Sequence, residues 1–105
     1  MSDAVTKLRT AATASVLTGP AKTSVERRRA AFDNKTVEQP ARALVDKVAN
    51  TAWKVTDEDV AAVKAAGLSE DEIFELTIAA AFGQSTRQLT RALTAVEAAF
   101  AEPTL

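Results

Sequence analysis

The sequence predicts an all-α protein of about five helices, and three observations lead to this fold class. Apolar residues recur at spacings of three and four, and no stretch shows the alternation of a half-buried strand. Two patterns of a hydroxyl followed three residues later by an acid, Thr56 with Asp59 and Ser69 with Glu72, mark helix starts. Gly67 lies between them, where a helix that ends in the left-handed conformation favours a residue without a Cβ. Residues 56–77 are therefore predicted to form a helix-turn-helix.

Composition predicts one domain with a thin core. A chain of 105 residues forms a single domain, and 47% of it is hydrophobic. Of these hydrophobic residues 23 are alanine, whereas only four Phe and one Trp are aromatic. Alanine favours helix but removes little area from water. We therefore expect thin, closely packed helices that finish burying their apolar faces against another subunit.

The residue types that are missing limit the chemistry. The chain has no cysteine and no histidine, so it lacks a thiol nucleophile, a disulfide and the usual general base at neutral pH. Residues 1–55 carry ten Lys and Arg against five Asp and Glu, and residues 56–105 carry three against nine. This uneven distribution of charge favours electrostatic attraction between subunits. It does not favour nucleic-acid binding, which needs an overall excess of positive charge. No segment resembles a membrane span or a signal peptide, and we expect a soluble cytoplasmic protein.

Two helices are expected in the N-terminal part. The first begins at Ser2 or Asp3, ends before Gly19-Pro20, and has inward positions at Val5, Leu8, Ala12 and Val16. The second begins after Thr23 or Ser24 and covers residues 25–34, with Val25, Ala31 and Phe32 inward. Three consecutive arginines at 27–29 spread around this helix, which predicts a solvated face and not a phosphate clamp.

A third helix is expected over residues 40–54, opened by Pro40, with inward positions at Leu44, Val45, Val48, Ala52 and Val55. Trp53 lies near its end, and we interpret this single tryptophan as a core or interface anchor and not as a ligand platform. The fourth helix follows Thr56 and ends at Gly67.

The last helix is predicted to be long, running from about Ser69 towards Pro103, which would end it. One apolar stripe contains Ile73, Leu76, Ala80 and Gly83, and a second contains Phe82, Leu89, Leu93, Val96 and Phe100. Ala79–Ala81 with Gly83 form a smooth patch that another backbone can approach, and Gly83 is a candidate kink. The other helices of one small domain can bury only one of these two stripes. We therefore predict that the second stripe, at Leu89, Leu93, Val96 and Phe100, contacts another subunit.

Residues 40–100 resemble the carboxymuconolactone decarboxylase / alkyl hydroperoxidase D family of small all-helical proteins. The most specific part is Ala-Gly-Leu-Ser-Glu-Asp-Glu-Ile at 66–73, followed by an alanine-rich long helix. The resemblance implies a family core at residues 40–105, an N-terminal helical extension at residues 1–39 within the same structural domain, and assembly as a trimer or hexamer.

The resemblance also implies where a catalytic site would lie. Peroxidase members of the family use a Cys-x-x-Cys pair, a histidine four residues later and an upstream glutamate. Counted back from Gly67 without a gap, the two cysteine positions fall on Ala52 and Val55 and the histidine position on Asp59. Alanine and valine cannot form a sulfenic acid or a disulfide, so that thiol mechanism is excluded within this chain. No catalytic, cofactor-binding or metal-binding residue is carried over.

Two other kinds of site are less consistent with the sequence. A DNA-binding helix-turn-helix would place Glu70, Asp71, Glu72 and Glu75 against phosphates, which repel them. A Mg²⁺ or Ca²⁺ site at these acids or at residues 57–59 lacks suitable spacing, and favourable interaction with the helix dipoles explains the acids better.

The functional hypothesis is a non-catalytic member of this family that acts as an oligomeric binding or scaffold module, without nucleic acid, membrane or cofactor. The alternative is an enzyme with carboxylate or hydroxyl chemistry, or the silent subunit of a complex with a Cys-bearing homologue.

Overall fold

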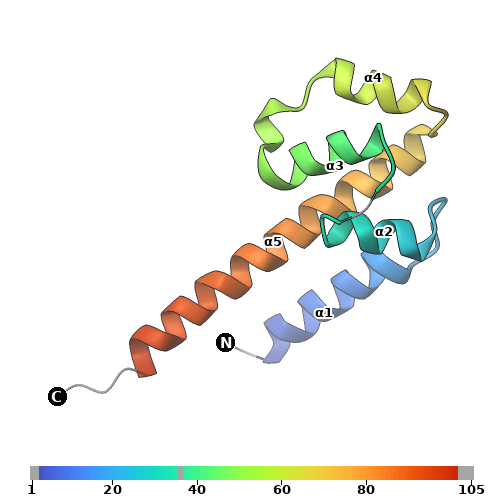
Figure 1. The fold of residues 1–105 in the computed structure, drawn as a ribbon. Coiled ribbons are helices and arrows are strands. Elements are labelled where there is room, and N and C mark those ends of the chain that lie inside the picture. Colours follow the sequence, from blue (N-terminus) through green and yellow to red (C-terminus); the bar gives the residue numbers. More distant parts are fainter. Residues whose placement is uncertain (1–2, 36, 102–105) are drawn as a thin grey trace.

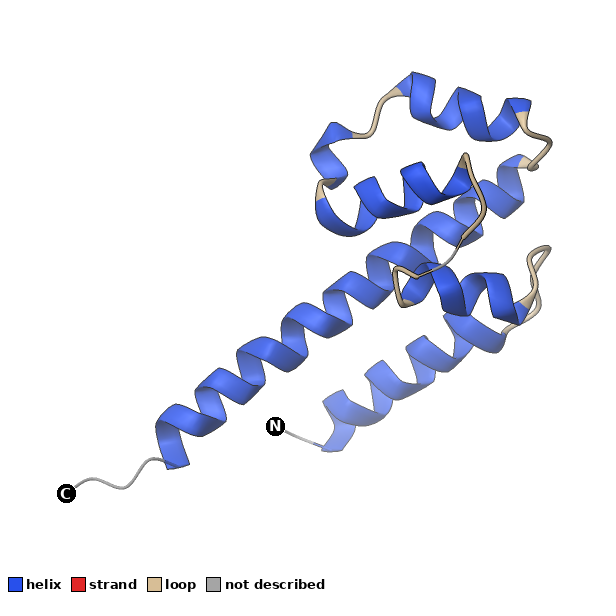
Figure 2. Cartoon of the chain, in the orientation of Figure 1, coloured by secondary structure: helices blue, strands red, loops and turns tan. Residues whose placement is uncertain are grey.

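The computed structural model describes residues 3–35 and 37–101 and contains five α-helices and one short 3₁₀ helix (Figures 1 and 2). Their bounds are α1 Asp3–Thr18, α2 Val25–Phe32, α3 Ala41–Asn50, η1 Ala52–Lys54, α4 Asp57–Ala65 and α5 Glu70–Ala101. No strand occurs among the described residues, so the all-α prediction is confirmed. No helix in the described ranges is long and apolar enough to cross a membrane.

Helix α5 is the axis of the molecule. Its 32 residues span about 48 Å, and the whole chain measures 61 × 28 × 20 Å. Figure 1 shows α2 and α3 against the first half of α5, with α4 beyond α3 and α1 running back alongside the middle of α5. The C-terminal half of α5 extends past the body formed by α2, α3 and α4.

The core lies where α2 and α3 meet α5. Its buried side chains come from both parts of the chain: Leu17, Ala31, Phe32, Val37, Ala41, Leu44, Val45, Val63, Ile73, Leu76, Ala79 and Ala80. Residues before position 40 therefore share one core with those after it. Gly83 is buried directly against the backbone of Phe32, and α5 runs through it as one helix. The expected close backbone approach is confirmed at Gly83, and Ala79 and Ala80 of the predicted patch are buried, whereas Ala81 is exposed.

The predicted helix starts and the turn between α4 and α5 are confirmed. The hydroxyl of Thr56 accepts from the amide of Asp59, whose carboxylate accepts from the amide of Thr56, and Ser69 and Glu72 form the same reciprocal pair. Gly67 has φ +104°, in the region that favours glycine. The caps proposed at Ser2 and the stop proposed at Pro103 lie outside the described residues.

The third helix is shorter than expected. It ends at Asn50, because Thr51 leaves the helical region with φ −145° and ψ 55°, and residues 52–54 form η1 instead. Asn50 and Thr51 are poor helix formers, and the Asn50 side chain donates to the carbonyl of Asp46. Ala52 is exposed, so its prediction as an inward residue is wrong. Trp53 is 79% exposed, so it is not a core residue of the single chain, and its role as an interface anchor stays a prediction.

The inward face of α1 was predicted only in part, since Val16 packs against the core as expected but Ala12 is exposed. Leu17 is buried, whereas Leu8 is 71% exposed and Val5 is 46% exposed. The face of α1 towards α5 instead carries Thr6, Arg9, Thr10, Thr13 and Leu17. Tertiary contacts decide this orientation, because Leu17 belongs to the shared core and Arg9 reaches α5.

The three arginines of α2 do not all form a solvated face. Arg28 is only 5% exposed, and its guanidinium donates to the carbonyls of Val16 and Gly19 at 3.1 and 2.9 Å. A cation at the C-terminal end of α1 is favourable for the helix dipole. Arg27 lies 3.7 Å from the Glu72 carboxylate, and Arg29 is exposed.

Candidate interaction surface

The structure places the positions that the family resemblance singled out on η1, directly after it and in the first turn of α4. Ala52 is exposed on η1, and Val55 is half-buried against the core. Asp59 accepts two hydrogen bonds from the Lys47 ammonium, at 3.0 and 2.8 Å, and one from the amide of Thr56 at 2.9 Å. The Lys47 hydrogen bond, followed by that of the Thr56 amide, holds the pKa of Asp59 below its ordinary value. Asp59 therefore links α3 to the start of α4.

Two of the acidic residues at the start of α5, Glu70 and Glu72, have structural partners. The Glu72 carboxylate accepts from the amide of Ser69 at 2.9 Å, and the Glu70 carboxylate lies 3.0 Å from the Lys64 ammonium. Hydrogen bonds from the amide and hydroxyl of Ser69 lower the pKa of Glu72. Among the described residues no group of three or more Asp, Glu, His or Cys side chains is arranged to hold a metal ion.

Glu75 fixes the loop between α1 and α2 to α5. Its carboxylate accepts from the amides of Lys22 and Thr23 and from the Thr23 hydroxyl, at 2.7 to 3.1 Å. Burial by itself raises the pKa of Glu75, but these hydrogen bonds outweigh burial, and the pKa lies below its ordinary value. The sequence did not predict this attachment, because the hydrogen-bond partners of Glu75 lie more than 50 positions away.

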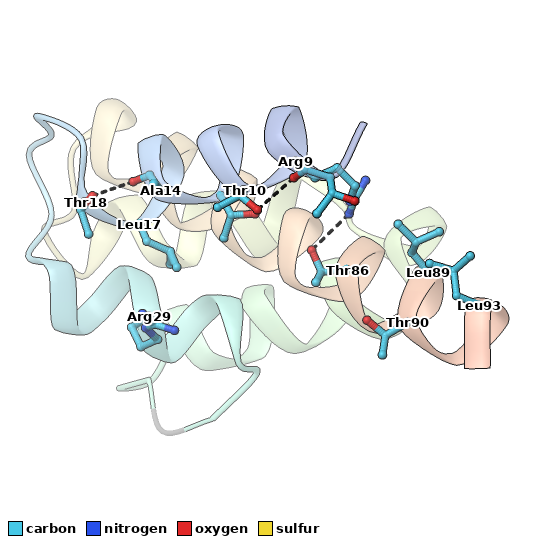
Figure 3. A pocket seen from close by; sticks show the side chains of 12 residues that line it. Arg9, Thr10, Ala14, Leu17, Thr18, Arg29, Thr86, Leu89, Thr90 and Leu93 are labelled. Carbon is cyan, nitrogen blue, oxygen red and sulfur yellow. Dashed lines mark hydrogen bonds between the residues drawn. The ribbon is translucent and has the colours of Figure 1, made fainter. Parts of the chain in front are cut away.

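A groove of about 630 Å³ runs between α1 and α5 (Figure 3). Leu17, Leu89 and Leu93 give it an apolar floor, and hydroxyl groups line its walls. Arg9 and Arg29 supply the positive charge. The lining comprises Thr6, Arg9, Thr10, Thr13, Ala14, Leu17, Thr18, Arg29, Thr86, Leu89, Thr90 and Leu93.

Arg9 connects the two walls of the groove. Its Nη2 donates to the hydroxyl of Thr86 at 3.3 Å, and the guanidinium carbon lies 5.7 Å from the centre of the Phe82 ring. This cation–π distance is within the favourable range. Within the part of the chain that the structure describes, neither Arg9 nor Arg29 forms an ion pair with a carboxylate. The helical spacing of Thr6, Thr10, Thr13 and Leu17 was the available sequence signal for this wall.

Beyond the groove, α5 exposes large apolar side chains. Leu89 and Leu93, two of the four predicted contact residues, are half-buried beside α1. The other two, Val96 and Phe100, are 47% and 86% exposed. The N-terminal end of α1 lies at the same end of the molecule as this part of α5 (Figure 1). We call the stripe Leu89, Leu93, Val96 and Phe100 the distal stripe.

The second predicted stripe of α5 is thus covered in its middle by the chain's own first helix. Phe82 packs against the core and beside Arg9, and α1 forms a wall over Thr86 and Leu89. At the opposite end of α5, Phe74 is 65% exposed and Ile78 is 37% exposed. The single chain leaves both ends of this face open.

No family model, curated protein or solved structure gives a significant match to the chain.

Proposed function

We propose that this chain is a non-catalytic helical module that acts through association with further copies of itself. The observation that carries the proposal is the exposure of Val96 and Phe100 in line with two half-buried leucines. Burying a side chain of this size is worth about 1.5–3 kcal/mol relative to leaving it in water. A contiguous row of exposed apolar side chains on one helix indicates an interaction site. Single exposed apolar residues are common on protein surfaces and need no such explanation.

The proposal includes the resemblance of residues 40–100 to the carboxymuconolactone decarboxylase / alkyl hydroperoxidase D family. What supports this part is the run at 66–73, with Gly67 in its turn and Ser69 at the next helix start. The resemblance carries no activity to this chain, because Ala52, Val55 and Asp59 supply no thiol and no imidazole.

Light scattering coupled to gel filtration at micromolar concentration tests self-association. We expect the wild-type chain to elute as a multiple of 11.1 kDa. Phe100→Asp should shift it to the single-chain mass while helix content by circular dichroism stays the same, because Phe100 is 86% exposed in the single chain. Ala98→Asp is the matched control, since it adds the same charge at an exposed position off the distal stripe. A well-folded wild-type species of single-chain mass would refute the proposal.

A second assay separates this module from the enzyme alternative. The purified oligomer should not consume peroxide in a thiol-coupled assay, because the chain contains no cysteine to carry the oxidation. Consumption of peroxide by the chain without a partner would overturn the non-catalytic part of the proposal.

A further inference from the structure

The distal stripe has the same spacing in both directions along α5. Leu89, Leu93, Val96 and Phe100 follow one another at intervals of four, three and four residues. When a second copy of the stripe runs antiparallel, Phe100 lies opposite Leu89 and Val96 lies opposite Leu93. A two-fold interface uses one surface patch on both subunits and needs this kind of self-complementarity.

From this we infer that two copies pair antiparallel along the distal stripes of α5, with the α1 helices completing a four-helix bundle. This inference rests on the proposed self-association. It adds which surface of the second copy is contacted, that the two α5 helices run antiparallel, and which residues lie opposite each other. The a and d spacing of three and four residues is the one by which helices pack lengthwise in such bundles. Larger assemblies can contain the same two-fold contact.

The groove provides the space for the partner helix. In this register the partner's last helical turns run over Leu93 and Leu89, which form the apolar floor between α1 and α5. Each Phe100, 86% exposed in the single chain, then contacts the Leu89 of the other copy. The interface would cover the two half-buried leucines and the two exposed residues together.

The charges near the two ends of the contact also favour the antiparallel direction. An antiparallel copy brings the C-terminal end of its α5 beside Thr86, where Arg9 is held. The last turn of α5 contains no basic residue, so its partial negative charge is not balanced within the described chain. Arg9 has no carboxylate partner among the described ion pairs. The guanidinium of one copy can therefore face the carbonyl end of the other copy's helix.

Disulfide cross-linking tests the register, and the natural chain offers no competing thiol. Leu89→Cys and Phe100→Cys are made as separate variants, mixed in equal amounts, and oxidised. We expect a covalent dimer on a denaturing, non-reducing gel from the mixture and little from either variant alone. A mixture of Arg91→Cys and Ala98→Cys is the matched control, because these exposed positions come to the same height in this register but point away from the interface, so the mixture should give little covalent dimer. Circular dichroism checks that each variant folds.

The outcomes separate this inference from the proposed function. An oligomer by light scattering without cross-linking in the Leu89/Phe100 mixture refutes the register while self-association stands. Cross-linking of Phe100→Cys with itself indicates a parallel pairing and also refutes the inference. A wild-type species of single-chain mass refutes both.

Arg9→Gln provides a second test that does not depend on replacing an apolar residue. It should weaken dimerisation about three- to tenfold at low salt, because a guanidinium near a helix C-terminus is favourable in each half of the two-fold contact. Lys7→Gln, on the same helix but not in the groove lining, should have little effect. Equal effects of the two substitutions would contradict the role of Arg9.

Discussion

The carbonyl oxygen of Phe32 on α2 lies so close to Gly83 on α5 that a Cβ at position 83 would fall 1.8 Å from it. Phe32 is the last residue of α2, and its carbonyl also accepts from the Arg87 guanidinium. The carbonyl of Phe32 has no donor within α2 because it lies at the helix end, and a side chain of α5 supplies that donor. This contact sets how closely the two helices approach.

Gly83→Ala should destabilise the fold. In an open helix this change stabilises by up to about 1 kcal/mol, because alanine has the higher helix propensity. Here the Cβ collides with backbone atoms, and overpacking of this kind costs about 1–3 kcal/mol. We expect a net loss in urea unfolding, with Ala81→Ser, on the exposed side of α5, nearly neutral. A gain in stability would show that α2 moves away without cost.

Gly67→Val should cost about 1–3 kcal/mol through the backbone alone. Gly67 has φ +104°, and a Cβ built there meets nothing within 4 Å. The cost therefore comes from forcing a β-branched residue into a conformation that L side chains rarely adopt. Thermal unfolding followed by circular dichroism measures it. An unchanged melting temperature would mean that the turn rearranges freely.

Glu75→Gln should lower the melting temperature at pH 7 by weakening the attachment of the α1–α2 loop. The pKa of Glu75 is lowered from an ordinary value of 4.5, so its stabilising effect is present above that pH and is lost as pH falls through the folded-state pKa. The difference between wild type and variant should therefore shrink in acid. Glu58→Gln, at an exposed position of α4, is the control. A difference that does not change with pH would contradict the role of the ionised carboxylate.

Ala52→Cys combined with Val55→Cys should form an intrachain disulfide. The amide of Val55 donates to the carbonyl of Ala52 at 3.2 Å, which closes a tight turn and brings the two positions together. Disulfides need Cα atoms about 4.4–6.8 Å apart. Thiol counting under denaturing conditions after oxidation should find none free, whereas two free thiols would place the positions out of reach. Peroxidase activity is not expected, because Asp59 remains paired with Lys47.

Local sequence patterns predicted the helix boundaries around Thr56, Gly67 and Ser69 correctly, since caps and left-handed turns involve residues within a few positions of one another. The close approach at Gly83 was also predictable, because a run of small residues permits it. The candidate surface was predicted in part: the sequence identified Leu89, Leu93, Val96 and Phe100 as one stripe, and the structure shows which of them the chain itself covers.

The sequence alone determined an all-α chain, its central turn and the absence of cysteine and histidine chemistry. Only the tertiary structure decided that α1 turns Leu8 outward and Thr10 towards α5, that Arg28 is buried, and that a groove forms beside Leu93. The physical reason is that α1 has no dominant apolar face of its own. Its orientation follows from Leu17 joining a distant core and from Arg9 reaching Thr86, contacts between residues far apart in the chain.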